Sequence, residues 1–310
     1  MAKSVTAQPT WRYNRLFYSL LLLAALLQFY LTYRLAYLRP IANYSTTKLL
    51  LIRLSFLLPQ VVIWWIAARS AKRFTNYAAG IKSSVDGQGM SLIGGGLVLL
   101  VAYIIILPLC SQLNSLAAHT TSIRVIAIIT NHLPLVVVLA AAIQIYRGSS
   151  RLSALASHDT VPRRRKVLIS GAFIVCMLSF AVDFYHQAPT LVTTEGVPRF
   201  FLNHNLLIFT YVLPHIAVWL MGLLASVNLA WYTTKIDGKI YRSLFRDVNR
   251  GLVLVFTSIF AAQLLMISPL IVMHLGVGII FVYMAIILGL AGYALLYRGT
   301  GKLQNLEEVG

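Results

Sequence analysis

Eight long apolar stretches occupy most of the chain, and the layout of its second half repeats that of its first. The segment Ser55–Trp64 (SFLLPQVVIW) has a counterpart in Thr210–Trp219 (TYVLPHIAVW), 155 residues later. Tyr77 and Tyr232 keep the same separation. A constant separation across helices and loops is hard to obtain by chance, so the sequence predicts a duplicated four-helix unit.

The end of each half extends this match. Residues 146–152 (YRGSSRL) correspond to residues 297–303 (YRGTGKL), which follow 151 residues later. Each unit has four apolar stretches, an even number, so both should have the same orientation, related by an axis along the membrane normal. The predicted organisation is a cytoplasmic segment at 1–15, a first repeat at 16–152, a basic cytoplasmic linker at 153–166, a second repeat at 167–303 and a cytoplasmic tail at 304–310.

The composition places these stretches in a lipid bilayer. The chain is 59% hydrophobic and 11% charged, whereas soluble domains carry about 25% charged residues. A helix that crosses a bilayer needs about 20 apolar residues. The sequence therefore predicts an all-α, polytopic membrane protein with eight transmembrane helices at 16–38, 49–68, 91–111, 122–146, 167–186, 205–231, 252–273 and 277–297.

The charges lie between these spans, which excludes nucleic-acid binding as the reason for the net charge of +18. With a cytoplasmic N-terminus, the outer segments hold only a small share of the 26 lysines and arginines. This asymmetry predicts a cell-membrane protein with both termini in the cytoplasm and with basic inner loops that attract anionic headgroups. The outer basic residues are Arg34, Arg39, Lys48, Arg53, Arg124 and Arg199.

Two of the inner connections are predicted to be long and basic: the one between the second and third spans and the one between the sixth and seventh. Asp86-Gly87 and Asp237-Gly238 are turn signals in these connections. Residues 241–250 alternate apolar and charged residues at helical spacing, which predicts an amphipathic helical extension at the inner surface.

A proline lies near the middle of two spans, the second and the sixth. Proline frees the carbonyl group four residues earlier, and here that residue carries a hydroxyl group that can satisfy it. A hydrogen-bonding side chain follows each proline. These features predict either a binding site at the bilayer centre or two kinks that only help the helices to pack. The two sets are Ser55, Pro59 and Gln60, and Thr210, Pro214 and His215.

Asp183 is the one acidic residue inside a predicted span. An ionisable group at membrane depth is a candidate functional residue. Asp183 can bind a cation, relay protons with His186 one turn later, or form a structural ion pair with Arg34 or Arg53.

Histidines are concentrated on the predicted outer side, and imidazole is a common metal ligand. The spacing matches no known metal motif, so no cofactor is expected. A haem or metal site remains an alternative, with His132, His215, Asp183 and His186 as its candidate ligands. A proton-sensitive outer face is the simpler explanation of the scattered histidines.

The leading functional hypothesis is passage of a small solute or ion between the two repeats. Its pathway residues would be Ser55, Pro59, Gln60, Asp183, Thr210, Pro214 and His215. The alternative is a receptor or sensory module that binds a ligand at its outer face and signals to a cytoplasmic protein partner. A membrane enzyme is less favoured, and a homo-oligomer stays open. No lysine lies in the last two spans, which excludes a retinal protein.

Overall fold

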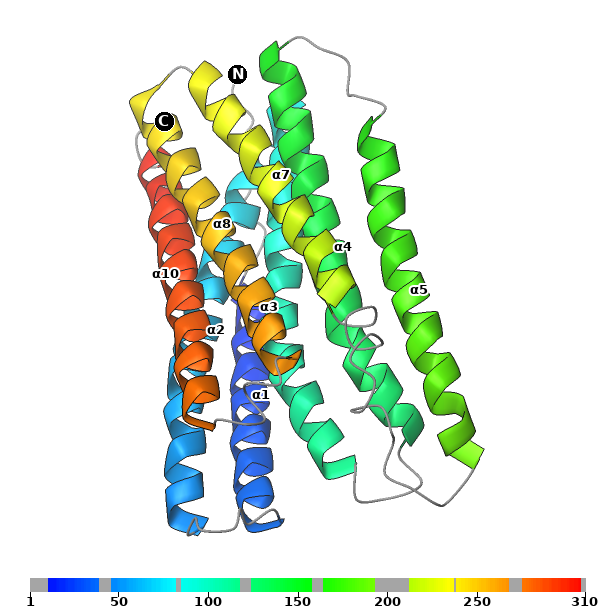
Figure 1. Ribbon diagram of the computed structural model, residues 1–310. Helices are drawn as coiled ribbons and strands as arrows, with labels where there is room; N and C mark the ends of the chain where they lie inside the picture. Colours follow the sequence, from blue (N-terminus) through cyan, green and yellow to red (C-terminus); the bar gives the residue numbers. More distant parts are fainter. Residues whose placement is uncertain are drawn as a thin grey trace. The chain divides into compact units, whose positions relative to one another are not determined.

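The chain is all-α throughout the part that the computed structural model describes, residues 11–38, 46–81, 85–117, 124–157, 164–192, 212–236, 238–267 and 275–307 (Figure 1). Eight helices occupy these ranges, in agreement with the predicted all-helical class. They are α1 (Trp11–Leu38), α2 (Thr46–Gly80), α3 (Val85–Ala117), α4 (Arg124–Ser157), α5 (Arg164–Val192), α7 (Leu213–Lys235), α8 (Lys239–Ile267) and α10 (Leu275–Glu307).

The chain divides into two compact units, residues 1–61 and residues 62–310. The first unit contains α1 and the beginning of α2. Within α1 the Thr32 hydroxyl group donates a hydrogen bond of 2.8 Å to the carbonyl oxygen of Gln28, which satisfies this buried side chain locally. The second unit contains the rest of α2 and the other six described helices.

Five helices within the described residues have the length and apolar composition needed to cross a membrane. Helices suit this environment because they satisfy their own backbone hydrogen bonds where no water is available. A shorter apolar helix segment covers Val167–Val182 in α5. The five segments are Leu54–Gly80, Asp86–Leu113, His132–Ala156, Leu213–Lys235 and Val282–Lys302.

The connection between α2 and α3 is short, so the long basic loop predicted there is wrong. The helix α2 continues to Gly80, and α3 begins at Val85. Asp86 lies in the first turn of α3 rather than in a turn between helices, where its carboxylate stabilises the positive end of the helix dipole. The connection between α7 and α8 is also short, since α7 ends at Lys235 and α8 begins at Lys239, so the long loop predicted there is wrong as well. Between these helices Gly238 has φ of 109°, a conformation that favours glycine. The turn predicted next to it is therefore confirmed.

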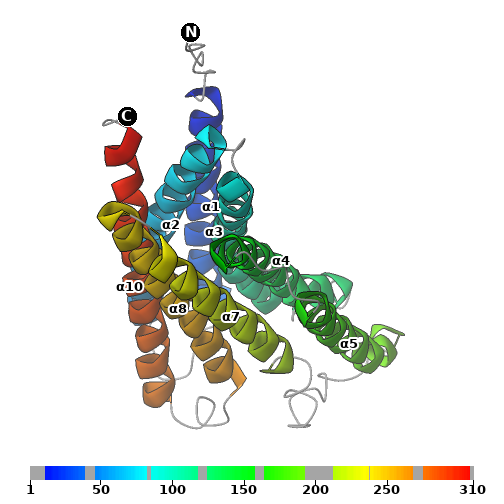
Figure 2. The same cartoon turned by 90° about the horizontal axis from the view of Figure 1, so that it is seen from above.

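Within the second unit, six helices contact one another in a closed order. The pairs α3 and α4, α4 and α7, α7 and α8, and α8 and α10 are in direct contact, and α5 packs on α4 and α7 (Figure 2). The part of α2 from Val62 onward completes the order, because Trp64 bonds to α3 and Arg73 bonds to Tyr297 of α10. Three helices of the first predicted half, α2, α3 and α4, thus follow one another in this order, and three helices of the second half, α7, α8 and α10, complete it.

Glycines allow two helix pairs to approach at backbone distance. A Cβ atom on Gly148 of α4 would lie 2.5 Å from the carbonyl oxygen of Gly89 in α3. Similarly, a Cβ atom on Gly251 of α8 would lie 2.8 Å from the carbonyl oxygen of Gly292 in α10. Small residues at such contacts are the usual device by which membrane helices pack closely.

A proline inside α3 creates a hydrogen-bond acceptor that another helix uses. Pro108 lacks an N–H group, so the Ile104 carbonyl one turn earlier has no helical donor. The indole Nε1 of Trp64 donates a hydrogen bond of 2.8 Å to this oxygen. Trp64 is fully buried. The buried backbone oxygen is therefore satisfied from α2, and the contact fixes α2 against α3.

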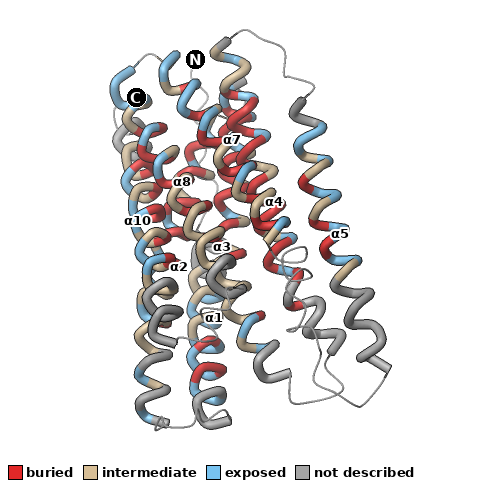
Figure 3. The backbone as a smooth tube through the Cα atoms, in the orientation of Figure 1, coloured by how far each residue is buried: buried red, intermediate tan, exposed pale blue. Residues whose placement is uncertain are grey.

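Large apolar side chains remain on the outside of the second unit. Figure 3 shows exposed positions along the described length of α5, while buried positions are concentrated on α3, α4, α7 and α8. The outward side chains of α5 include Phe173, Ile174, Met177 and Leu178, each about half exposed or more. A continuous apolar surface of this kind is unfavourable in water and suits a helix that faces lipid.

Candidate functional site

Three of the predicted pathway residues, Ser55, Pro59 and Gln60, lie in the first unit. Ser55 lies about one turn before the adjacent Pro59 and Gln60 in α2, and each is partly exposed. Pro59 stands inside the helix, so the prediction that α2 continues through its proline is confirmed. The role of these residues in a pathway stays a prediction.

The matching set in the second unit lies at the start of α7. Pro214 occupies the first turn of the described helix, and both Pro214 and His215 are buried. Thr210 lies outside the described residues, so its pairing with the proline stays a prediction. A buried histidine in an apolar helix keeps its standing as a candidate functional residue.

The acidic candidate, Asp183, lies in α5 together with His186. The side chains of both residues fall outside the described part of the structure. Their proposed ion-binding or proton-relay roles therefore remain predictions.

His132, the other candidate haem or metal ligand, is buried in α4. Its ring meets the ring of Phe180 in α5 edge-on, with centroids 5.1 Å apart. Thr130 of α4 and Ser179 of α5 are also buried, so polar side chains lie in the helices α4, α5 and α7 that pack on one another. Among the described residues, no three potential metal-ligating side chains come together.

Sequence reasoning missed a polar cluster at one end of the helices. This end carries most of the described lysines and arginines and is here called the basic end. The Tyr77 hydroxyl group of α2 donates a hydrogen bond of 3.0 Å to the Tyr241 hydroxyl of α8. The Tyr232 side chain of α7 lies within electrostatic range of the Asp86 carboxylate of α3. Tyr77 and Tyr232 are buried, so four helices are joined here through side-chain tips. The equal spacing of Tyr77 and Tyr232 was the available signal, but tyrosines near span ends also suit an interfacial belt.

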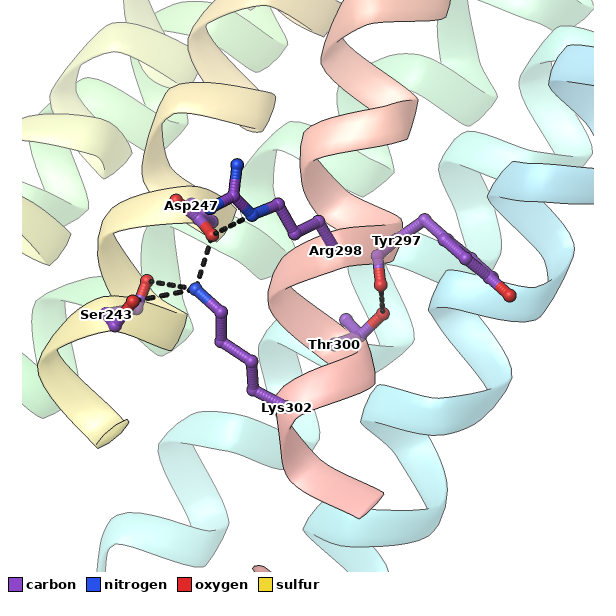
Figure 4. A network of polar contacts seen from close by, with 6 residues as sticks. All are labelled: Ser243, Asp247, Tyr297, Arg298, Thr300 and Lys302. Atoms are coloured by element: carbon purple, nitrogen blue, oxygen red, sulfur yellow. Dashed lines mark hydrogen bonds and ion pairs between the residues drawn. The ribbon is translucent and has the colours of Figure 1, made fainter. Parts of the chain in front are cut away.

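A second missed feature is an ion-pair network between α8 and α10 (Figure 4). Asp247 is buried, and its Oδ2 lies 2.6 Å from Nζ of Lys302 and 3.5 Å from Nε of Arg298. The Lys302 amine also donates a bond of 2.7 Å to the Ser243 hydroxyl. The carboxylate is thus compensated by two cations, which makes the network structural in character.

Comparison with known proteins finds no matching family model, no similar curated protein and no similar solved structure. The long apolar helices, their outward apolar side chains and their buried polar groups are those of a multi-pass helical membrane protein. The more specific function is therefore inferred from the chain's own residues.

Proposed function

We propose that the chain is a membrane carrier built from two duplicated halves, and that it passes a small solute or ion between them. The observation that carries this proposal is a set of contacts that recur in both halves at the separations found in the sequence. Alternating access by rocking of one repeat on the other is a known mechanism for transporters with this organisation.

The first recurring contacts join the third and fourth helices of each half. A Cβ atom on Gly96 would meet Ile145, and one on Gly251 would meet Leu296. These residues correspond pairwise at the separations of 155 and 151 residues. Each side of the contact therefore has its counterpart in the other half.

A second close approach in the same helix pairs repeats in the same way. A Cβ atom on Gly148 would lie 3.0 Å from the backbone nitrogen of Ile93, and one on Gly299 would lie 3.2 Å from that of Val248. Together with the first contact, this equivalence supports duplication of a helix pair rather than chance similarity of two segments.

Contacts between the halves are reciprocal. Tyr77 of the first half donates a hydrogen bond to Tyr241 of the second, and Tyr232 of the second lies within electrostatic range of Asp86 of the first. Tyr232 corresponds to Tyr77, and Tyr241 corresponds to Asp86, at one separation. Two reciprocal contacts of this kind are expected when a two-fold axis passes between them.

The nature of these contacts supports movement between the halves. Within each half, the paired helices meet at backbone distance through glycines, which favours a rigid body. At the basic end, the contacts between the halves include the Tyr77–Tyr241 hydrogen bond and the electrostatic interaction of Tyr232 with Asp86. Such polar interactions contribute about 1 kcal/mol each, so they can open at this end while α4 and α7, which also pack across the halves, remain in contact.

The pathway residues proposed from sequence are Ser55, Pro59, Gln60, Asp183, Thr210, Pro214 and His215. His215 is the best supported among them, because it is a buried titratable group in an apolar helix. We retain Asp183 as the proposed cation or proton site.

Reconstituted liposomes test this function. Osmotic swelling in urea, glycerol and glycine gradients measures solute entry, and the dye pyranine reports proton entry. We expect wild-type protein to accelerate at least one of these fluxes over empty liposomes and Asp183→Asn or His215→Ala to reduce it. Tyr30→Phe is the control, because Tyr30 is exposed and outside the proposed pathway. Rates equal to those of empty liposomes for every probe would contradict a carrier and favour the receptor alternative.

A further inference from the structure

Three residues on the basic half of α2 form a stripe along one helix face. Trp65, Arg69 and Arg73 follow one another at intervals of four residues, which brings them to the same side. Tyr297 of α10 lies against this stripe, because its ring stacks on Trp65 with centroids 6.3 Å apart and an interplanar angle of 30°.

Both arginines are held over aromatic rings. The Cζ atom of Arg69 lies 4.8 Å from the ring centroid of Trp65, and that of Arg73 lies 4.3 Å from the ring centroid of Tyr297. Arg73 also donates a hydrogen bond of 3.3 Å to the Tyr297 hydroxyl. Cation–π contacts fix guanidinium groups without neutralising their charge. The four side chains therefore form a cationic platform that is organised before any ligand binds.

No carboxylate among the described residues pairs with either arginine of this platform. Asp247 is bound by Lys302 and by Arg298. In Figure 4 Tyr297 points away from Asp247, toward the opposite side of α10. The platform thus presents two fixed positive charges with no acidic partner from the described protein.

A corresponding helix contact exists without these charges. At the separation of the proposed repeats, the stripe corresponds to Leu220, Leu224 and Asn228 of α7, and Tyr297 corresponds to Tyr146 of α4. The helices α4 and α7 pack on each other. Because a neutral version of the stripe occurs in a packed helix pair, the two arginines are not needed for packing itself.

The surroundings of the platform fit an amphipathic anion. Arg69 is exposed, Trp65 is 44% exposed, and Val62, on the same face one turn earlier, is 49% exposed. A phosphate group can accept paired N–H donors from the guanidinium groups. An acyl chain can then lie along Trp65 and Val62 at membrane depth. Anionic phospholipids supply both parts and gather at the basic side of a membrane protein.

We propose that Trp65, Arg69, Arg73 and Tyr297 form a binding site for the phosphate headgroup of an anionic phospholipid. The site is independent of the solute pathway. It localises one bound lipid between α2 and α10, beyond the diffuse attraction that a basic surface exerts on a bilayer.

Native mass spectrometry of the full-length protein in detergent tests this site, with phosphatidylglycerol as the probe and phosphatidylcholine for comparison. We expect the wild-type protein to retain phosphatidylglycerol in preference to phosphatidylcholine. Arg69→Gln/Arg73→Gln should weaken phosphatidylglycerol binding about thirtyfold, as expected for the loss of two charges near a headgroup. Arg147→Gln/Arg151→Gln is the matched control, since it removes two exposed charges at the same spacing from α4, and its effect should stay below about threefold.

Two further arms keep the result decisive. Arg69→Lys/Arg73→Lys preserves the charge and should fold, but it loses paired donation from a planar group, so binding should fall between those of the wild type and the glutamine variant. Inorganic phosphate at millimolar concentration should not displace the lipid. Equal losses in the α4 control, unchanged binding in both Arg69/Arg73 variants, or displacement by free phosphate would each overturn the proposed lipid site.

Discussion

The indole Nε1 of Trp64 lies 2.8 Å from the carbonyl oxygen of Ile104, the oxygen that Pro108 deprives of its helical donor. The break in the helical hydrogen bonds of α3 and the bond from α2 are therefore two parts of one arrangement. Trp64→Phe should leave a buried carbonyl unsatisfied and lower the free energy of unfolding by about 1–3 kcal/mol. Equilibrium unfolding in mixed micelles measures this difference.

Replacement of the proline provides the control for that effect. In a Pro108→Ala background, the restored N–H group can bond to Ile104, so Trp64→Phe should cost less than in the wild type. Equal costs in the two backgrounds would show that Trp64 stabilises the protein through its bulk rather than through this hydrogen bond.

The Asp247 network should be sensitive to loss of its carboxylate. Asp247→Asn leaves the Lys302 amine without its counterion, and we expect a loss of roughly 2–3 kcal/mol, because Lys302 is partly exposed and water compensates some of the charge. Arg298→Gln should cost at most about 0.5 kcal/mol, since Arg298 is 71% exposed. Asp247→Asn combined with Lys302→Met should cost less than the sum of the single changes, and simple additivity would argue against the pair.

Alanine substitutions at two glycines should differ in their effect on stability, because only one of these glycines lies at a close helix contact. Gly148→Ala places a methyl group 2.5 Å from the Gly89 carbonyl oxygen and should destabilise the protein by about 1–3 kcal/mol. Gly171→Ala meets no atom within 4 Å and should be neutral or slightly stabilising, because alanine favours helix. Thermal unfolding of the two variants in detergent provides the comparison, and equal shifts would contradict the close approach of α3 and α4.

Orientation in the membrane can be tested at the chain ends. Because the basic segments are predicted to face the cytoplasm, a fluorescent protein fused after Gly310 should fold and fluoresce, whereas alkaline phosphatase fused there should be inactive. The opposite pair of results would invert the proposed topology.

The helical class of the described residues follows from the sequence because long apolar runs have few alternatives in lipid. The helix ends at the basic end were placed less well. The α2 helix continues beyond residue 68 to Gly80. Its last turns carry charged residues, but one side of them is buried, including Phe74, and this packing stabilises the helix. Hydropathy registers the charges but not that one-sided burial.

The candidate site was only partly accessible to sequence reasoning. His132 and His215 stand out in a sequence because they are polar groups within apolar runs, and both are buried. The Tyr77–Tyr241 bond could not be read from sequence, because its partners are 164 residues apart. The bond depends on how α2 and α8 meet, which no local pattern specifies.

Reciprocal cross-linking tests the duplicated arrangement most directly. In a background with Cys110→Ala and Cys176→Ala, one variant would carry Tyr77→Cys and Tyr241→Cys, and a second would carry Asp86→Cys and Tyr232→Cys. Single-cysteine variants would control for links between molecules. The account predicts that a short bifunctional maleimide joins both pairs within one chain in native membranes, with similar yields. Cross-linking of only one pair, or of neither, would contradict two halves that meet about a common axis.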